Sequence, residues 1–283
     1  MKKIGIITIQ KCDNFGADLQ AYALGAKLRA LGYDAENIDY LFYKHPRHQG
    51  GKGERPVFRL SLVNRVKEVL FPIVAGLKNL KRRKAIRARH ERFKAWTDKH
   101  LKCGPEYRSV ASLYQNPPQY DVYMVGSDQV WNPRMGSNIL PYFLDFAPAG
   151  VRKVSYASSL GVSELPTPAF LKYRELLKDF SHVGLREARG AELVGRMKLD
   201  AEVKHVLDPT LLLTEKDWSE VATNPNPKSL IPTSSSTTSS RARRRLHLRI
   251  ELQPKRAFRS FALETEPMAR LSLSGSSPMR TVW

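Results

Sequence analysis

The stretch MKKIGIITIQKCDNFGADLQAYALGAKLRALGYDAENIDY, residues 1–40, decides the fold. Residues 4–9 form a continuous apolar run that is typical of a buried strand. Apolar residues then recur at helical spacing from Leu19 to Leu31, and a glycine follows as a helix stop. Residues 35–40 have the pattern of a second strand. A strand, a helix and a strand in this order predict a parallel sheet of the doubly wound α/β class.

The same alternation of predicted strands and helices continues to about residue 222. Further strands are predicted at 120–126, 151–158, 183–186 and 203–207, and helices at 60–71, 76–99, 167–180, 187–197 and from about 214. We therefore expect residues 1–222 to form one Rossmann-like domain, with helices on both faces of a parallel sheet.

The pattern ends near Asn224. A run of Ser and Thr at 234–240 is followed by Arg-rich sequence, and residues 224–283 hold nine Arg and two Lys against three Glu, a net charge of +8. Such a polar tract buries too little apolar surface to offset the entropy of ordering, so we predict a disordered tail over 223–283. Two origins stay open for this tail, a change of reading frame and a natural basic extension.

Composition narrows the class of protein. The 283 residues carry a formal charge of +20 and only two cysteines, which excludes a disulfide framework and favours the cytoplasm. The sequence has no apolar run of membrane-spanning length. Basic residues concentrate at 78–94, where a helix could be a solvated surface or could contact an anionic membrane or an acidic polymer.

The loop 11–17 is the first candidate site. Unpaired backbone amides at the start of the following helix favour an anion or a polar oxygen. Gly16 permits close approach of the backbone, and Asn14 can hydrogen-bond hydroxyl groups. The loop lacks the dinucleotide and P-loop glycine patterns. A structural turn with an Asx cap is the alternative.

The segment Gly126-Ser127-Asp128-Gln129-Val130-Trp131-Asn132 is the second candidate, because it follows a predicted strand. Asp128 is a candidate base or clamp for sugar hydroxyls, and Trp131 offers a flat face that could stack on a sugar ring. Ser127 lacks the following glycine of a nucleophile elbow. The alternative is a helix start capped by Ser127 or Asp128.

A third group stands at the ends of later strands. Tyr156, Arg186 and Asp208 would meet at one edge of a parallel sheet, where Arg186 could hold a carboxylate or a phosphate. Alternatively, Arg186 pairs with Glu187 and caps the next helix. No metal site is predicted, and His45 and His48 are expected to be solvent-exposed.

In their order and spacing over residues 1 to about 222, these segments resemble the polysaccharide pyruvyl transferase family. The resemblance is carried by Asn14-Phe15-Gly16-Ala17 with Leu19-Gln20-Ala21-Tyr22-Ala23-Leu24, Gly126 to Asn132, Tyr142-Phe143-Leu144-Asp145-Phe146, Ser155-Tyr156-Ala157-Ser158, Leu185-Arg186-Glu187 and Leu207-Asp208-Pro209-Thr210.

The resemblance implies the amino-terminal half of a glycosyltransferase-B-like protein that moves pyruvate from phosphoenolpyruvate to hydroxyls of a cell-surface polysaccharide or its precursor. It implies phosphoenolpyruvate as donor substrate, no separate cofactor, and a sugar or polysaccharide acceptor. The site residues that it implies are Asp128 and Arg186 as catalytic groups, and Asn14, Phe15, Gly16, Ser127, Gln129, Trp131, Asn132 and Tyr156 as substrate-binding groups.

The chain departs from the family after residue 222, where a second Rossmann-like half should begin. We expect this chain to be truncated there or shifted in frame, which leaves its activity open. The alternative function is a non-catalytic basic module that binds sugars or polyanions. No specific nucleic acid is expected, because the basic segments lack interleaved aromatic residues.

Overall fold

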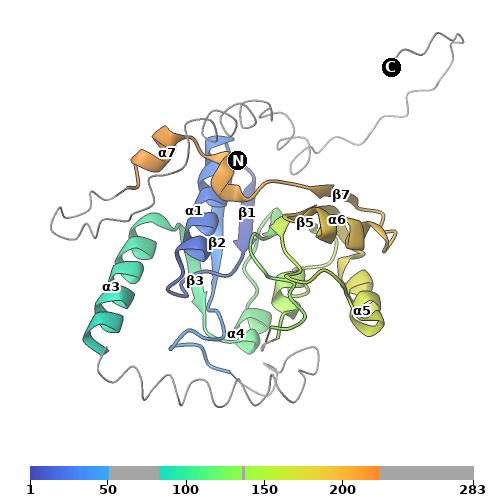
Figure 1. The fold of residues 1–283 in the computed structure, drawn as a ribbon, viewed down its shortest axis with the longest axis horizontal. Coiled ribbons are helices and arrows are strands. Elements are labelled where there is room, and N and C mark those ends of the chain that lie inside the picture. The colour runs from blue at the N-terminus through green and yellow to red at the C-terminus, as the bar shows by residue number, and fades with distance from the viewer. Residues whose placement is uncertain (51–82, 136–137, 223–283) are drawn as a thin grey trace, which may run out of the picture.

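The computed structural model describes residues 1–50, 83–135 and 138–222 (Figure 1). Seven parallel strands of these residues form one sheet in the order β3-β2-β1-β4-β5-β6-β7. The strands are β1 (Lys3–Ile7), β2 (Asp34–Tyr40), β3 (Cys103–Tyr107), β4 (Val122–Val125), β5 (Arg152–Ser158), β6 (Phe180–Leu185) and β7 (Glu202–His205). The predicted α/β class with a parallel sheet is confirmed.

Helices or a 3₁₀ turn lie between successive strands, as parallel pairing requires, and η4 and α7 follow the last strand. They are α1 (Phe15–Ala30), α3 (Arg83–His100), α4 (Val110–Gln115), α5 (Thr167–Leu177), α6 (Ala188–Gly195) and α7 (Glu215–Ser219), with the 3₁₀ turns η3 (Leu140–Phe143) and η4 (Pro209–Leu212).

Alternating residues of the central strand β4 build two cores. Val122 and Met124 pack in the cluster that α1 covers, whereas Tyr123 and Val125 pack in the cluster on the other face. This follows from the two-residue period of a strand, which sends neighbouring side chains to opposite faces. A continuous apolar run in the sequence is the consequence of burial on both faces.

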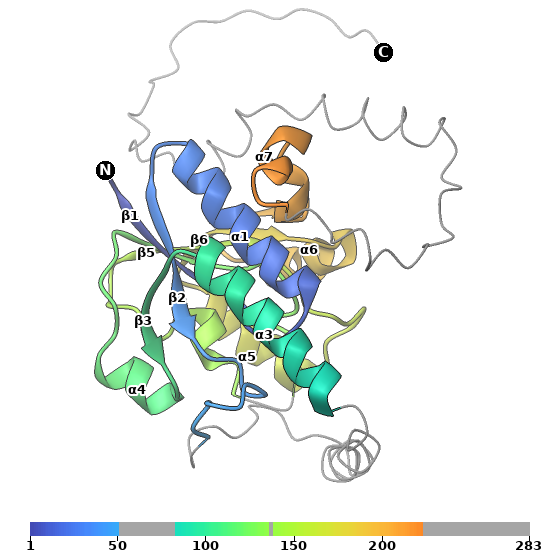
Figure 2. The ribbon, with the colours of Figure 1, turned by 90° about the vertical axis from the view of Figure 1, so that its left-hand side faces the viewer.

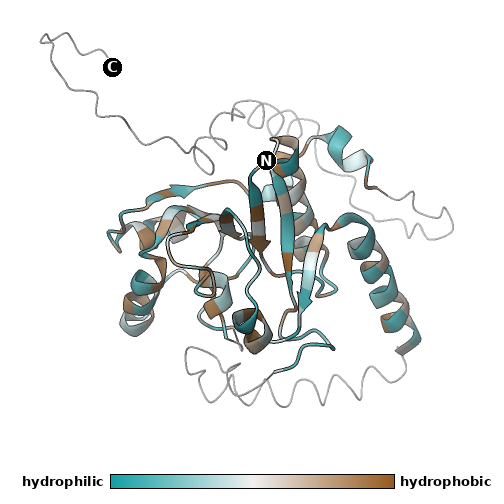
Figure 3. Cartoon of the chain, turned by 180° about the vertical axis from the view of Figure 1, so that it is seen from behind, coloured by the Kyte–Doolittle hydropathy of each residue, from teal (hydrophilic) through white to brown (hydrophobic). Residues whose placement is uncertain are grey.

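Helix α3 is attached to the molecule mainly through α1, and the two helices run side by side in Figure 2. The ring of Phe15 lies 4.4 Å from that of Phe93, and the ring of Tyr22 lies 5.8 Å from that of Trp96. The rest of α3 is largely hydrophilic (Figure 3). In the part of the chain that the structure describes, no helix is long and apolar enough to cross a membrane.

Two elements were not predicted from the sequence, β3 and α4. Helix α4 begins at a capping box in which Ser109 and Ser112 bond each other's backbone, a serine variant of the usual pattern. Helix α7 begins at a second capping box, formed by Thr214 and Asp217, where the sequence predicts a helix start. The predicted helix 60–71, part of that at 76–99 and the tail 223–283 lie outside the described residues.

Candidate functional site

A cavity of about 600 Å³ lies at the carboxyl edge of the sheet. Because all seven strands are parallel, the loops that leave β1, β2 and β4 meet at this edge. Those loops supply nearly all of the wall, and α3 adds His90. The lining residues are Ile9, Lys11, Cys12, Asp13, Asn14, Phe42, Tyr43, Lys44, His45, Pro46, His90, Asp128, Gln129, Asn132 and Met135.

The loop between β1 and α1 brings Asn14 to the cavity. Asn14 occupies the N-cap position of α1, where its Oδ1 accepts a hydrogen bond from the Gly16 backbone at 2.9 Å. The alternative of an Asx cap is therefore confirmed for Asn14. Asn14 also lines the cavity. Phe15 is 68% exposed and lies on a different surface, against Phe93 of α3.

The loop after β4 brings Asp128, Gln129 and Asn132 to the same cavity. No helix begins at Ser127 or Asp128 in the described chain, so the capped-helix alternative is wrong. Asp128 instead has a φ of 72°, and its backbone forms an isolated parallel β-bridge with Ser158 at the end of β5. Its Oδ1 accepts a hydrogen bond from the Gln129 backbone at 2.8 Å, and Asn132 Nδ2 donates to Gln129 Oε1 at 2.9 Å.

Gly126 lets this loop approach β5. Its φ is +119°, and a Cβ atom built on it would stand 2.1 Å from the carbonyl oxygen of Tyr156. Only glycine combines that backbone conformation with so close an approach. The peptide bond between Gly126 and Ser127 is cis.

The expectation that Trp131 stacks on a sugar is wrong for this structure. Trp131 is completely buried, and its ring lies 5.4 Å from that of Phe143 in a stacked arrangement. Its indole nitrogen donates to the carbonyl oxygen of Tyr142 at 2.8 Å, and its own carbonyl oxygen accepts from Tyr173. Trp131 therefore anchors the loop to the core, because the burial of so large an aromatic ring stabilises the fold.

Ser127 and Tyr156 are interior residues too. The Ser127 backbone donates to Gln20 Oε1 at 3.0 Å and accepts from Thr8 Oγ1, and the whole residue is buried. Tyr156 is 4% exposed, and burial, followed by the nearby Asp208 charge, raises the pKa of its hydroxyl. Neither belongs to the described residues that line the cavity, so their predicted contact with substrate is not seen.

Arg186 lies behind the cavity wall and holds three carboxylates. Its guanidinium is 3.1 Å from Glu187, 3.2 Å from Asp208 and 3.8 Å from Asp128. Burial lowers the pKa of Arg186, but the hydrogen bond and charge of Glu187, with the two Asp residues, outweigh it and raise the pKa overall. The pair of Arg186 and Glu187 is present, but the Glu187 side chain does not cap α6. Through its three ion pairs, Arg186 connects the loops after β4, β6 and β7.

The sequence analysis assigned no binding role to four basic side chains that line the cavity: Lys11, which lies within the predicted loop 11–17, and Lys44, His45 and His90. Lys11 pairs with Asp39 at 2.6 Å, and His90 Nδ1 lies 2.9 Å from Asp13. The topology could have identified the pair Lys44 and His45, because a loop that follows a parallel strand lies at the carboxyl edge.

The histidine expectation was wrong for the same loop. His45 is half-buried, and burial, then the charge of Arg47, lowers its pKa. His48 is half-buried as well, with Nδ1 2.9 Å from the Leu41 carbonyl oxygen.

The thiols and acids of the described residues offer neither a nucleophilic cysteine nor a metal cluster. Burial raises the pKa of both Cys12 and Cys103 to about 12, so both stay protonated. Groups of three or more metal-ligating side chains do not occur among the residues described.

Comparison with known proteins supplies the family. The model of the polysaccharide pyruvyl transferase family matches residues 14–264, which include Asn14 and the lining residues of the loops after β2 and β4. The match continues past residue 222, where the sequence analysis expected the family pattern to end. The chain matches no curated protein and no solved structure. Since the family match spans most of its length, the chain belongs to the polysaccharide pyruvyl transferase family.

Proposed function

We propose that this protein transfers pyruvate from phosphoenolpyruvate to hydroxyls of a cell-surface polysaccharide or its precursor, with the acceptor in the sheet-edge cavity. One observation carries the placement: Asn14, Asp128, Gln129 and Asn132 come from two distant loops and line one cavity. Amide and carboxylate groups that converge in this way suit recognition of sugar hydroxyls. The family match supports a transferase.

On the acceptor side, we assign Asp128 as the general base. Its carboxylate is oriented by the Gln129 backbone and by Arg186, and it faces the cavity from the loop after β4. Gln129 and Asn132 are held to each other by a hydrogen bond, which limits their rotation before a sugar binds. Arg186 acts as a positioning residue for Asp128, in place of the direct donor contact that the sequence suggested.

On the donor side, phosphoenolpyruvate presents a carboxylate and a phosphate. Lys44, on the loop after β2, lines the same cavity as Asp128, and its positive charge suits these anions. His45 lies beside it, and its lowered pKa favours a neutral imidazole that can donate a hydrogen bond. Lys44 is exposed and stands 5.2 Å from the ring centre of Tyr43. We therefore assign Lys44 to the donor anions.

The proposed reaction balances with these parts. A proton from water adds to the methylene carbon of phosphoenolpyruvate, and a sugar hydroxyl attacks the adjacent carbon while Asp128 takes its proton and returns it to solvent. A second hydroxyl of the sugar then attacks that carbon as its bond to the phosphate oxygen breaks. The proton of this hydroxyl leaves with the phosphate, and the products are hydrogen phosphate and a cyclic ketal. We also propose a cytoplasmic location. It suits the use of phosphoenolpyruvate and the two free thiols, Cys12 and Cys103.

The test is transfer by the full chain. It is incubated with phosphoenolpyruvate and a panel of hexosides and oligosaccharides with free hydroxyl pairs, while released phosphate and the ketal mass are measured. We expect turnover with at least one acceptor, and a loss of roughly 100-fold or more in kcat/KM for Asp128→Asn. The control Asp121→Asn changes an acid at the opposite end of β4 and should keep activity. Absence of transfer across the panel, or full activity of Asp128→Asn, overturns the proposal.

A further inference from the structure

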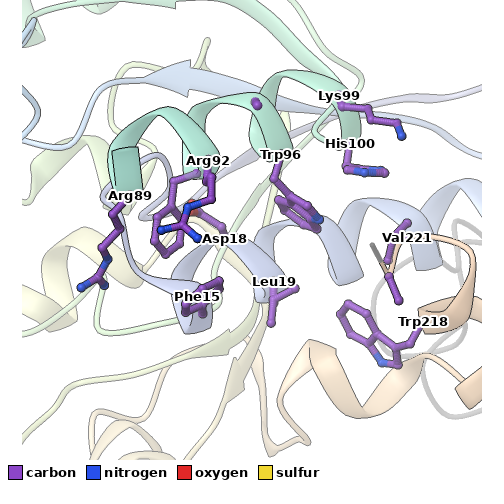
Figure 4. Close-up of a pocket in the computed structure, with 13 residues that line it drawn as sticks. Phe15, Asp18, Leu19, Arg89, Arg92, Trp96, Lys99, His100, Trp218 and Val221 are labelled. Atoms are coloured by element: carbon purple, nitrogen blue, oxygen red, sulfur yellow. The ribbon is translucent and has the colours of Figure 1, made fainter. Parts of the chain in front are cut away.

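A second hollow of about 950 Å³ runs between α1, α3 and α7, beside the sheet-edge cavity (Figure 4). We call it the helix groove. Its walls are mostly apolar, with Phe15 and Leu19 on α1, Trp96 on α3 and Trp218 on α7. Its volume is at the upper end of small-molecule sites, enough for a hydrocarbon chain.

The rim of the helix groove is cationic. Arg89, Arg92 and Lys99 of α3 line it, and all three are exposed. The acidic residues of the described part of α3, Glu91 and Asp98, are both engaged elsewhere: Glu91 pairs with Arg87, and Asp98 pairs with Lys94. The three rim cations form no ion pair with any of the described residues. The rim of the groove therefore carries uncompensated positive charge from Arg89, Arg92 and Lys99.

This charge selects among occupants. Ala222 and Val221 line the groove, so the tail that follows is the nearest candidate in the chain itself. Residues 224–283 carry a net charge of +8, however, and the rim repels them. The acid that lines the groove, Asp18, is only 1% exposed and adds little negative charge at the surface. An anionic occupant with an apolar part fits both features.

We propose that the helix groove binds an anionic membrane phospholipid. One acyl chain would lie against Phe15, Trp96 and Trp218, and the phosphate would contact Arg92 and Lys99. Half-buried tryptophans beside basic side chains are typical of protein surfaces at a membrane interface. The lipid would hold the enzyme at an anionic bilayer, and this holds whether or not the proposed transfer activity is found.

The test uses the full chain and vesicles of phosphatidylcholine, with or without phosphatidylglycerol. Binding is measured by co-sedimentation, and contact with the acyl chain by quenching of tryptophan fluorescence with brominated lipid. We expect binding only with phosphatidylglycerol, and quenching that falls in Trp96→Phe and Trp218→Phe. The other two tryptophans of the sequence, Trp131 and Trp283, are unchanged in these variants, so any quenching of theirs is common to all of them.

A matched pair of variants separates a groove from general charge. Arg92→Gln with Lys99→Gln removes two rim cations and should weaken vesicle binding roughly tenfold or more. Arg87→Gln with Lys94→Gln removes the same charge from the paired side of α3 and should leave binding within about twofold. Thermal unfolding confirms that each variant is folded.

Three results overturn the proposal. One is no binding to anionic vesicles. Another is an equal loss in the two double variants, which indicates general attraction to polyanions. The third is binding without quenching, which indicates that the acyl chain does not enter the groove.

Discussion

At the scale of single residues, Asp18 is a buried carboxyl group whose ionisation destabilises the fold. Its Oδ1 accepts a hydrogen bond from the Lys11 backbone at 2.7 Å, while its Oδ2 is buried with no hydrogen-bond partner in the described structure. Burial raises the pKa of Asp18 from 3.8 to about 6. Folding therefore favours the protonated form, and the resulting stability is complete below about pH 4 and is lost as pH rises through about 6.

The variant Asp18→Asn keeps an oxygen for Lys11 and cannot ionise. We expect the free energy of unfolding of the variant, relative to the wild type, to rise by about 3 kcal/mol between about pH 4 and pH 7. Urea unfolding at several pH values measures it. In contrast, a hydrogen bond from the Thr214 backbone lowers the pKa of Asp217 from 3.8, so the free energy of unfolding of Asp217→Asn relative to the wild type should fall with rising pH, and do so below about pH 4. A flat difference for Asp18→Asn would show that its carboxyl group is not buried in solution.

Single residues of the site were partly predictable. Asn14, Asp128, Gln129 and Asn132 could be placed because a strand end and a helix start locate polar groups at one edge of the sheet. Trp131 and Ser127 lie in the same segment, yet they are buried. Sequence gives no side-chain direction in an irregular loop, where neither the two-residue period nor the helical period applies. A tryptophan there can face the core or the solvent.

At the scale of elements, the loop from Gly126 to Asn132 depends on its contact with β5. Gly126→Ala adds a Cβ at 2.1 Å from the Tyr156 carbonyl oxygen and must shift the loop. We expect a loss of about 3 kcal/mol or more in unfolding free energy, and a loss of transfer activity because Asp128 moves with the loop.

Gly150→Ala is the matched control for that variant. Gly150 has a φ of +78°, but a Cβ there meets nothing within 4 Å. Its alanine variant should cost about 1–2 kcal/mol from backbone strain alone and keep activity. Denaturant unfolding and the transfer assay compare the two. Equal effects would mean that contact with β5 does not set the loop.

Elements with strong periodicity were predicted, and weak ones were missed. The continuous apolar run of β4 and the apolar spacing of α1 are visible in the sequence because both elements are buried. Strand β3 reads Cys-Gly-Pro-Glu-Tyr and is an edge strand, so it lacks an apolar run. Helix α4 is six residues long, too short to show a helical period.

At the scale of the whole molecule, the parallel sheet and the helices over it create two adjacent hollows. The sheet-edge cavity includes Asn14 and His90, and the helix groove includes their neighbours Phe15 and Arg89. The first is polar and takes its groups from strand ends, whereas the second is apolar with a cationic rim. The sequence predicted the first from topology. It could not predict the second, because the groove depends on how three helices pack.

The central claim is that the acceptor sugar binds at the carboxyl edge of the sheet, and NMR of the full chain tests it most directly. The acceptor that turns over in the transfer assay is titrated into isotope-labelled protein. We predict shifts in the side-chain amide signals of Asn14, Gln129 and Asn132, and no shift in the indole signals of Trp96 and Trp218. Unchanged amide signals at saturating acceptor, or shifts confined to the two indoles, would contradict the account.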